Sequence, residues 1–186
     1  MAIRKAAAYS KQNTRPYTRN SRSKSKAYIK TVPYSKIVKF KMGDQKAFMD
    51  KKHKYVLTML AEQGIMIRDN ALESGRMLLH KILEEKIPGQ YFMSVKVYPH
   101  HMLRENKTAA GAGADRVSTG MTQSFGVVIG RAAMVNPGKE IFIVACSTDK
   151  GARLARTLLT RIKAKLPCSS RILFSGPQMK SQEDEE

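Results

Sequence analysis

A stretch of 28 residues without helical or strand-like periodicity occupies the middle of the chain and restricts how it can fold. It runs from Pro99 to Gly126, contains four glycines and three Lys or Arg residues, and has strand-like runs on both sides. Loops of this length are uncommon inside a compact domain and are usually functional. Their backbone N–H groups stay solvated or are satisfied by a partner. We therefore expect a long central loop that reaches an anionic partner; a merely solvated surface loop is the alternative.

The balance of charge also indicates a polyanionic partner. The 186 residues include 34 Lys and Arg against 15 Asp and Glu, which gives a formal net charge of +19. Self-repulsion of this kind opposes compaction, and a bound polyanion relieves it. Nucleic acid is the commonest such partner, with a membrane surface as the second candidate. No run reaches the roughly 18 apolar residues that a membrane-spanning helix requires, so we expect no membrane insertion.

The positive charge belongs both to an N-terminal arm and to the body of the chain. Residues 1–41 contain 12 Lys or Arg and no acid, whereas residues 42–182 carry 22 basic and 11 acidic residues. A basic arm alone would fit a localisation signal, but a basic body indicates a binding surface. We expect an extended basic arm over 1–30, one α+β domain over 31–175 with its loop at 99–126, and an acidic, disordered tail over 176–186.

The arm has the composition of a segment that becomes ordered on RNA. It cannot bury enough apolar surface to order itself. Guanidinium groups suit phosphate oxygens, and tyrosines can stack on unpaired bases. A solvated, disordered tail is the alternative. The arm residues that we expect to contact RNA are Arg4, Lys5, Tyr9, Arg15, Tyr17, Arg19, Arg22, Lys24, Lys26 and Lys30.

Periodicity predicts an α+β fold for the body. Alternation of apolar and polar residues predicts strands at 38–42, 55–60, 65–67, 91–98, 127–135, 140–146 and 171–174. Residues 44–54 are either a short helix or a connection. Strands and helices follow one another without regular βαβ alternation, which favours α+β over α/β.

Two turn signals and two helices refine this expectation. A Pro-Gly pair at 136–139 predicts a hairpin between the strands at 127–135 and 140–146, and Gly130 predicts a bend or bulge in the first of them. Asp69 or Asn70 is the expected cap of one helix, which Pro88 ends. The second helix is expected over 148–165, with an apolar face. On its opposite side lie Arg153, Arg156 and Lys163. We expect the outward faces of both helices to neutralise RNA phosphates, with Arg153 and Arg156 among the contacting residues.

No arrangement of residues singles out a metal or cofactor site. Cys146 and Cys168 form no CxxC pair, so we expect no structural zinc but reduced thiols in an intracellular protein. His100 and His101 point to opposite sides of a strand end and are poorly placed to share a metal; a buried or RNA-contacting histidine is the simpler interpretation. The glycine-rich run at 111–114 lacks the GK[ST] of a P-loop. We therefore expect no cofactor and no metal.

An enzymatic function has equally little support. A catalytic carboxylate needs a second acid or a base within reach, and no spacing in the chain singles out such a pair. We expect no catalytic residue. An RNA-acting enzyme that uses His101, Glu105 or Asp115 is the remaining enzymatic alternative. The N-terminus lacks the apolar run of a secretion signal, so we expect a cytoplasmic protein.

The central loop resembles a ribosomal signature. The residues Ala112-Gly113-Ala114-Asp115-Arg116, Thr119-Gly120-Met121 and Phe125-Gly126 follow the pattern AGADR-x-x-TGM-x-x-x-FG. This pattern is typical of the large-subunit ribosomal family numbered sixteen in bacteria and ten-e in archaea and eukaryotes. Residues 15–19, 33–37, 97–101 and 104–107 resemble the archaeal–eukaryotic branch of that family. The resemblance extends over residues 4–174, nearly the whole chain.

The resemblance implies a hammerhead-type α+β fold, with two helices packed on one side of a mixed sheet. It implies a structural role in the large ribosomal subunit, with large-subunit rRNA and neighbouring ribosomal proteins as partners and without a homo-oligomer. It further implies that the loop approaches tRNA and the peptidyl-transferase region. A non-ribosomal nucleic-acid architectural protein is the alternative. The residues expected near tRNA are Arg104, Lys107, Gly111, Gly113, Asp115, Arg116, Thr119, Gly120 and Met121.

The sequence departs from the family pattern at several points. Thr122 stands where the family usually has an arginine, which removes one expected phosphate contact at the loop base. Lys41 stands where an aspartate is common. The SRSKSK run at 21–26 and the acidic end have no clear counterpart.

Overall fold

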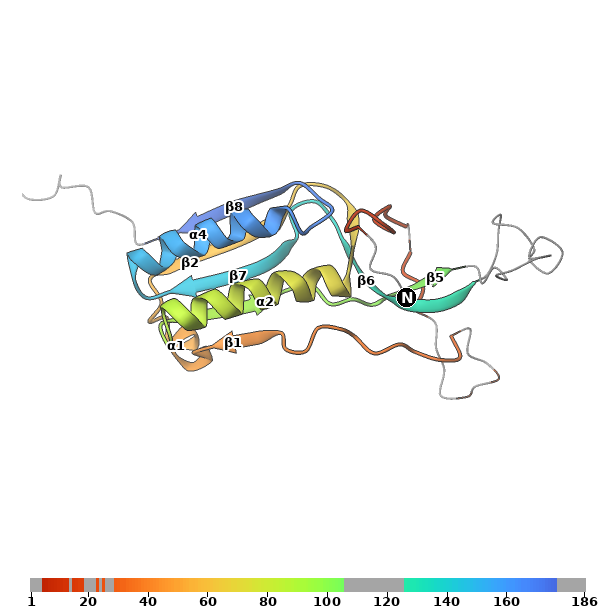
Figure 1. The fold of residues 1–186 in the computed structure, drawn as a ribbon, viewed down its shortest axis with the longest axis horizontal. Helices are drawn as coiled ribbons and strands as arrows, with labels where there is room; N and C mark the ends of the chain where they lie inside the picture. Colours follow the sequence, from red (N-terminus) through yellow and green to blue (C-terminus); the bar gives the residue numbers. More distant parts are fainter. Residues whose placement is uncertain are drawn as a thin grey trace, which may run out of the picture.

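The computed structural model describes residues 5–13, 15–18, 23, 25, 29–105 and 126–176. These residues form an elongated α+β molecule with three helices and two antiparallel sheets, which confirms the expected fold class (Figure 1). The elements in chain order are β1 (Lys41–Gly43), α1 (Gln45–Met49), β2 (Tyr55–Ala61), β3 (Ile65–Arg68), α2 (Asp69–Lys86), β4 (Tyr91–Val95), β5 (His101–Glu105), β6 (Val127–Val135), β7 (Glu140–Cys146), α4 (Asp149–Lys163) and β8 (Ser170–Ser175).

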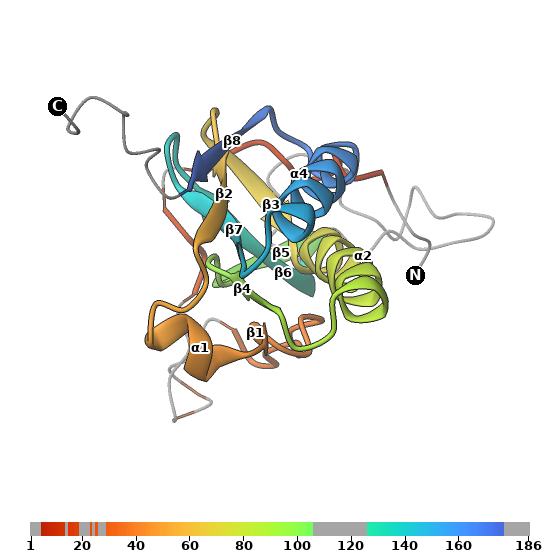
Figure 2. The ribbon, with the colours of Figure 1, turned by 90° about the vertical axis from the view of Figure 1, so that its left-hand side faces the viewer.

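The larger sheet has the strand order β1-β4-β7-β2-β8, and α2 and α4 lie side by side on one of its faces (Figure 2). Two helices on one side were expected, but the expected mixed sheet is wrong, because every described pair of neighbouring strands is antiparallel. The reason lies in the crossovers. The strand β2 is inserted between β7 and β8, which flank α4, and β7 is inserted between β2 and β4. The α4 crossover is thus split by an antiparallel strand, whereas α2 follows β3 of the smaller sheet and leads into β4 of the larger one.

The predicted hairpin at 136–139 is also wrong, although its turn forms. The Lys139 N–H donates to the Asn136 carbonyl at 3.1 Å, and Gly138 has a φ of +79°. However, β6 pairs with β3 and β5, whereas β7 pairs with β2 and β4. Both edges of β7 are therefore occupied, and the chain passes from the smaller sheet to the larger one at this turn.

The main core lies between the helices and the larger sheet. It contains the expected apolar faces, with Leu72, Leu79 and Leu83 of α2 and Leu158 and Ile162 of α4 all buried. The strand β4 departs from the expected alternation, because all five of its residues are buried. The cause is α1, whose Phe48 stacks on Phe92 at 4.3 Å between ring centroids and covers the opposite face at that end.

The smaller sheet, β3-β6-β5, extends from one end of the molecule (Figure 1). Its strand β5 lies within the stretch expected to be a loop from Pro99; the pairing with β6 orders it although the sequence lacks a clear pattern. The register shifts at Leu103, opposite Gly130, which confirms the predicted irregularity there. Glu105 pairs with Val127, so the chain leaves and re-enters the sheet at neighbouring points. Residues 106–125 of the predicted loop lie outside the described residues.

Local details at the helix starts differ from expectation. The N-cap of α2 is Arg68, whose backbone is extended because β3 runs directly into the helix. The predicted cap residue Asp69 is already helical, and its carboxylate accepts from the Lys36 N–H at 3.1 Å. Both cysteines, Cys146 and Cys168, are free and buried.

Candidate nucleic-acid interface

The described part of the arm packs across one face of the smaller sheet. The Met66 N–H of β3 donates to the Ser10 carbonyl at 2.9 Å, and the Met102 N–H of β5 donates to the Tyr17 carbonyl at 3.0 Å. Tyr9, the residue before Ser10, is half-buried against a small cluster that includes Met66 and Leu103. The arm is thus joined by backbone hydrogen bonds to both outer strands of this sheet, β3 and β5.

His101 is a buried residue that holds the arm in place. Its side chain is 4% exposed, and its Nδ1 accepts from the Tyr17 N–H at 2.8 Å. Burial lowers the pKa of His101, and the charge of Arg104 lowers it further. The neutral imidazole is therefore favoured, as its acceptor role requires. His100 is exposed on the other side, as expected, and within the described residues no group of three or more His, Cys, Asp and Glu could hold a metal ion.

The base of the central loop meets the arm at Arg104. The guanidinium carbon of this exposed residue lies 4.0 Å from the centre of the Tyr17 ring. A guanidinium over an aromatic ring is a favourable cation–π contact. Arg104 is the only predicted tRNA-proximal residue among the described ones. The others, Lys107, Gly111, Gly113, Asp115, Arg116, Thr119, Gly120 and Met121, lie outside the described residues.

Some of the predicted rRNA-contacting residues are likewise described, and others are not. Lys5, Arg15 and Lys30 are exposed, whereas Tyr9 and Tyr17 are half-buried against protein. Arg153 and Arg156 are exposed on α4, and Arg153 forms an exposed ion pair with Asp149 at 2.9 Å. The residues Arg4, Arg19, Arg22, Lys24 and Lys26 lie outside the described residues.

The two long helices differ strongly in charge. The helix α4 carries five Lys or Arg residues and one acid, Asp149, whereas α2 carries four acids and three Lys or Arg residues. All five cations of α4 are exposed. A polyanion is therefore attracted more strongly to α4 than to α2.

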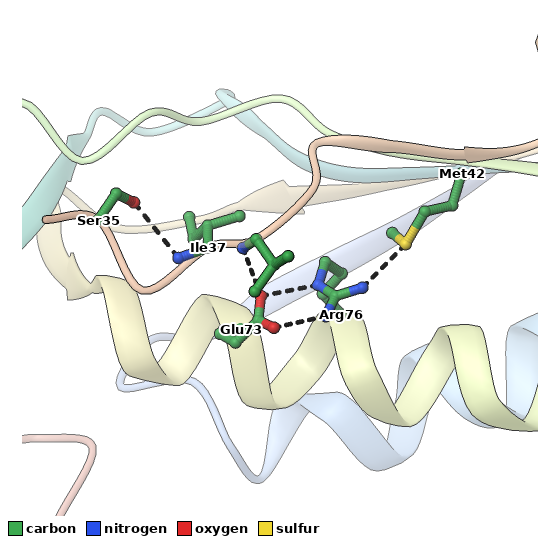
Figure 3. A network of polar contacts seen from close by, with 6 residues as sticks. Ser35, Ile37, Met42, Glu73 and Arg76 are labelled. Carbon is green, nitrogen blue, oxygen red and sulfur yellow. Dashed lines mark hydrogen bonds and ion pairs between the residues drawn. The ribbon is translucent and has the colours of Figure 1, made fainter.

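A segment before β1 is fastened to α2 by carboxylates (Figure 3). Glu73 accepts from the Arg76 Nε–H at 2.7 Å and from the Val38 N–H at 3.4 Å, while the Arg76 Nη1–H donates to the Met42 sulfur. The hydrogen bond from Arg76 holds the pKa of Glu73 below its ordinary value. This contact fixes the path of the chain into β1 and, with it, the place of Lys41.

Sequence reasoning missed a third basic region, around α1. Lys46, Lys51, Lys52 and Lys54 are exposed there, next to Lys41 and Lys96 of the larger sheet. In the strand predicted at 38–42, Lys39 and Lys41 alternate with apolar residues, and this was one signal for it. The other lysines are close to this strand only in the folded chain.

Comparison with known proteins agrees with the loop signature. The family profile "Ribosomal protein L16p/L10e" matches residues 12–173. The chain is 39% identical over 179 residues to the large ribosomal subunit protein uL16 of Methanococcus maripaludis, covering 96% of this chain and 97% of that protein. It is 42% identical over 175 residues to that of Staphylothermus marinus, covering 94% of each, and 36% identical over 171 residues to that of Archaeoglobus fulgidus, covering 91% and 92%.

None of the helices in the described residues has the length and apolar character needed to cross a membrane. The profile match and the nearly full-length relatives agree on one family of structural ribosomal proteins rather than enzymes. The chain belongs to the ribosomal protein L16p/L10e family.

Proposed function

We propose that this protein is a structural constituent of the large ribosomal subunit in the cytoplasm. Its relatives are named as large-subunit proteins, and its net charge of +19 suits a chain that is completed by RNA. The arm and the outer face of α4 neutralise phosphates of large-subunit rRNA. Neighbouring ribosomal proteins are further partners, and the protein does not form a homo-oligomer.

The observation that carries this proposal is the junction of the arm with the loop base. The contact between Arg104 and Tyr17, together with the hydrogen bond from Tyr17 to His101, keeps the arm beside β5. The exposed cations Lys5 and Arg15 therefore lie at the same end of the molecule as the point where the central loop leaves the sheet. Exposed cations at this end suit RNA on the outside and the loop's approach to tRNA and the peptidyl-transferase region.

The rRNA contact is tested by the salt dependence of binding. Each neutralised phosphate contributes about −0.7 to −0.9 to the slope of log K against log salt. The double variant Arg153→Ala/Arg156→Ala should reduce the magnitude of the slope for a large-subunit rRNA transcript by about 1.4 to 1.8. The variant Lys81→Ala, which removes an exposed charge from α2, should leave the slope unchanged. An unchanged slope in the double variant would exclude α4 from the interface.

The tRNA-facing role of the loop needs a separate experiment in assembled subunits. Because Glu105 pairs with Val127, a short glycine linker can replace residues 107–124 without separating β5 from β6. The shortened protein should still enter large subunits in stoichiometric amount, while tRNA binding and peptide synthesis by those subunits fall. Normal tRNA binding would refute the role of the loop but not the rRNA contact. Recovery of the intact protein away from large subunits after a moderate salt wash would instead favour a non-ribosomal architectural protein.

A further inference from the structure

The larger sheet has a second face, which α2 and α4 do not cover. Tyr91 of β4 points to α2, where its hydroxyl contacts His80 at 2.9 Å and Glu84 at 2.6 Å. The next residue, Phe92, points the other way and stacks on Phe48 of α1. The helix α1 therefore lies on the opposite side of the sheet from the two long helices (Figure 2). The cross-strand pair Lys41–Ser94 lies on this second face as well.

A cleft of about 430 Å³ opens between α1 and this face. Phe48, Phe92 and Val56 give it an apolar, largely aromatic floor. Its volume lies in the range of pockets that hold small ligands. We call this space the α1 cleft; the lining residues that matter for its chemistry are Lys41, Phe48, Lys51, Val56, Phe92 and Lys96.

The α1 cleft is cationic and lacks a compensating acid. Lys41, Lys51 and Lys96 line it, and none of the three forms an ion pair with another described residue. The two acids of the region are engaged elsewhere: Asp44 caps α1 by accepting from the Ala47 N–H at 2.9 Å, and Asp50 pairs with Lys52 at 3.2 Å. Three cations around an aromatic floor suit a ligand with a flat ring and negative charge.

Lys51 occupies a backbone position that normally favours glycine. Its φ is +55°, and it follows the C-cap of α1. The Lys51 N–H donates to the Phe48 carbonyl and the Lys52 N–H to the Ala47 carbonyl, which is the hydrogen-bond pattern of a Schellman motif. A side chain at this position costs conformational energy that glycine avoids. Strain of this kind is typical of functional positions, and here the strained residue places a cation in the cleft.

We propose that the α1 cleft binds one unpaired RNA nucleotide, with its base on Phe48, which the buried Phe92 supports from below, and its flanking phosphates beside Lys41, Lys51 and Lys96. Single-stranded RNA is commonly held by aromatic side chains that stack on bases and cations that follow the backbone. The site deepens the proposed rRNA-binding function and rests on it, but lies apart from the arm and α4. The larger groove along α2, of about 840 Å³, is lined by Glu73 and Glu85 as well as lysines, and so suits a polyanion less well.

The first test distinguishes the loss of a charge in the cleft from a loss of stability. The substitution Lys51→Gly removes one charge at a position where glycine relieves the backbone, so the thermal stability should stay the same or rise. Binding of the full-length protein to a large-subunit rRNA transcript should lose about 0.7 to 0.9 from the magnitude of its log–log salt slope. Lys81→Ala is the matched control, because it removes one exposed lysine from α2. A stable Lys51→Gly protein with an unchanged salt slope would overturn the proposal.

The second test locates the base. The same transcript, with 4-thiouridine in place of uridine, is cross-linked to the full-length protein by ultraviolet light and the linked peptides are identified. We expect nucleotides on the tryptic peptides 47–51 or 87–96. The substitution Phe48→Ala should remove these cross-links and weaken binding by between about fivefold and about 150-fold. The conservative variant Phe48→Tyr, which keeps an aromatic ring, should retain both.

The outcomes distinguish this site from the proposed function as a whole. Salt-dependent binding with cross-links confined to the arm and α4 would overturn the α1 cleft and leave the rRNA-binding role intact. A wild-type protein that ignores the transcript would refute both. If Phe48→Ala loses the circular-dichroism signal of the folded protein, Lys51→Gly and the cross-linked peptides of the wild type decide the question.

Discussion

Replacing Glu73 by glutamine tests whether the carboxylate of α2 stabilises the path of the chain into β1. The side chains of Arg76 and Glu73 are only 9% and 12% exposed. Removing one partner of a buried ion pair leaves the other charge unpaired and costs about 3–5 kcal/mol. The glutamine amide keeps one acceptor oxygen for Arg76 or the Val38 N–H. We therefore expect Glu73→Gln to lower the free energy of unfolding by about 3 kcal/mol, the lower end of that range.

The effect should depend on pH in a defined direction. The pKa of Glu73 is lowered in the folded protein, chiefly by the hydrogen bond from Arg76. A group with a depressed folded pKa stabilises the protein above its unfolded pKa, about 4.3 for glutamate, and loses that contribution as the pH falls through the folded value. The wild type should therefore exceed Glu73→Gln in stability at pH 7, and the difference should shrink below about pH 4.

Urea unfolding followed by circular dichroism at pH 7 and pH 3 measures both quantities. In thermal unfolding a loss of about 3 kcal/mol corresponds to a fall in Tm of about 6–12 °C for a domain of this size. Glu85→Gln, an exposed acid on the same helix, is the control and should change the stability by less than about 0.5 kcal/mol. A loss below about 1 kcal/mol for Glu73→Gln, or an equal loss at both pH values, would show that the buried pair contributes little.

Three further predictions follow from single contacts. Gly126 has a φ of +71°, and a Cβ there would lie 2.8 Å from the Glu105 carbonyl oxygen, so Gly126→Ala should lower the free energy of unfolding by about 1–3 kcal/mol. The control Gly138→Ala, also at positive φ but in open space, should lower it by less. Equal losses of stability in thermal unfolding would contradict the steric argument. The lowered pKa of His101 means that the folded state resists its protonation, so the contact with Tyr17 should weaken as the pH falls below about 6.5. The protection of the amides of residues 9–17 against hydrogen exchange, relative to their intrinsic rates, should then fall at pH 5, and His101→Gln should remove that pH dependence. Burial raises the pKa of the Cys146 thiol to about 12, so iodoacetamide at pH 8 should label it in urea but hardly at all in the native protein, and rapid native labelling would show that this end of β7 opens.

The sequence predicted those parts of the fold that depend on local periodicity. The faces of α2 and α4 follow from residues three or four apart, and the structure buries the apolar side of each. The irregularity beside Gly130 was also a local signal. These features need no knowledge of which strands become neighbours.

The errors concern the choice of partners over long distances in the chain. The Asn136–Lys139 turn has the right residues for a hairpin, but β7 is held on both sides by β2 and β4, which lie far away in sequence. The strand β5 has no clear pattern of its own and is defined by β6. The lysines of the α1 cleft come from three separate segments, so no single stretch of sequence shows them together. The family signature at 112–126, by contrast, was a local pattern, and the family profile confirms it.

The arrangement of charge suits the proposed association with RNA. The basic face of α4 and the α1 cleft lie on opposite sides of the larger sheet, and the arm lies on the smaller one. RNA on these surfaces would screen the cations from several directions, whereas RNA on one side alone would leave the others to repel one another. The acids of α2, and the groove along it that Glu73 and Glu85 help to line, attract a polyanion less. A protein built this way is suited to fill a space between RNA segments, with the α2 side left to solvent or to a neighbouring protein.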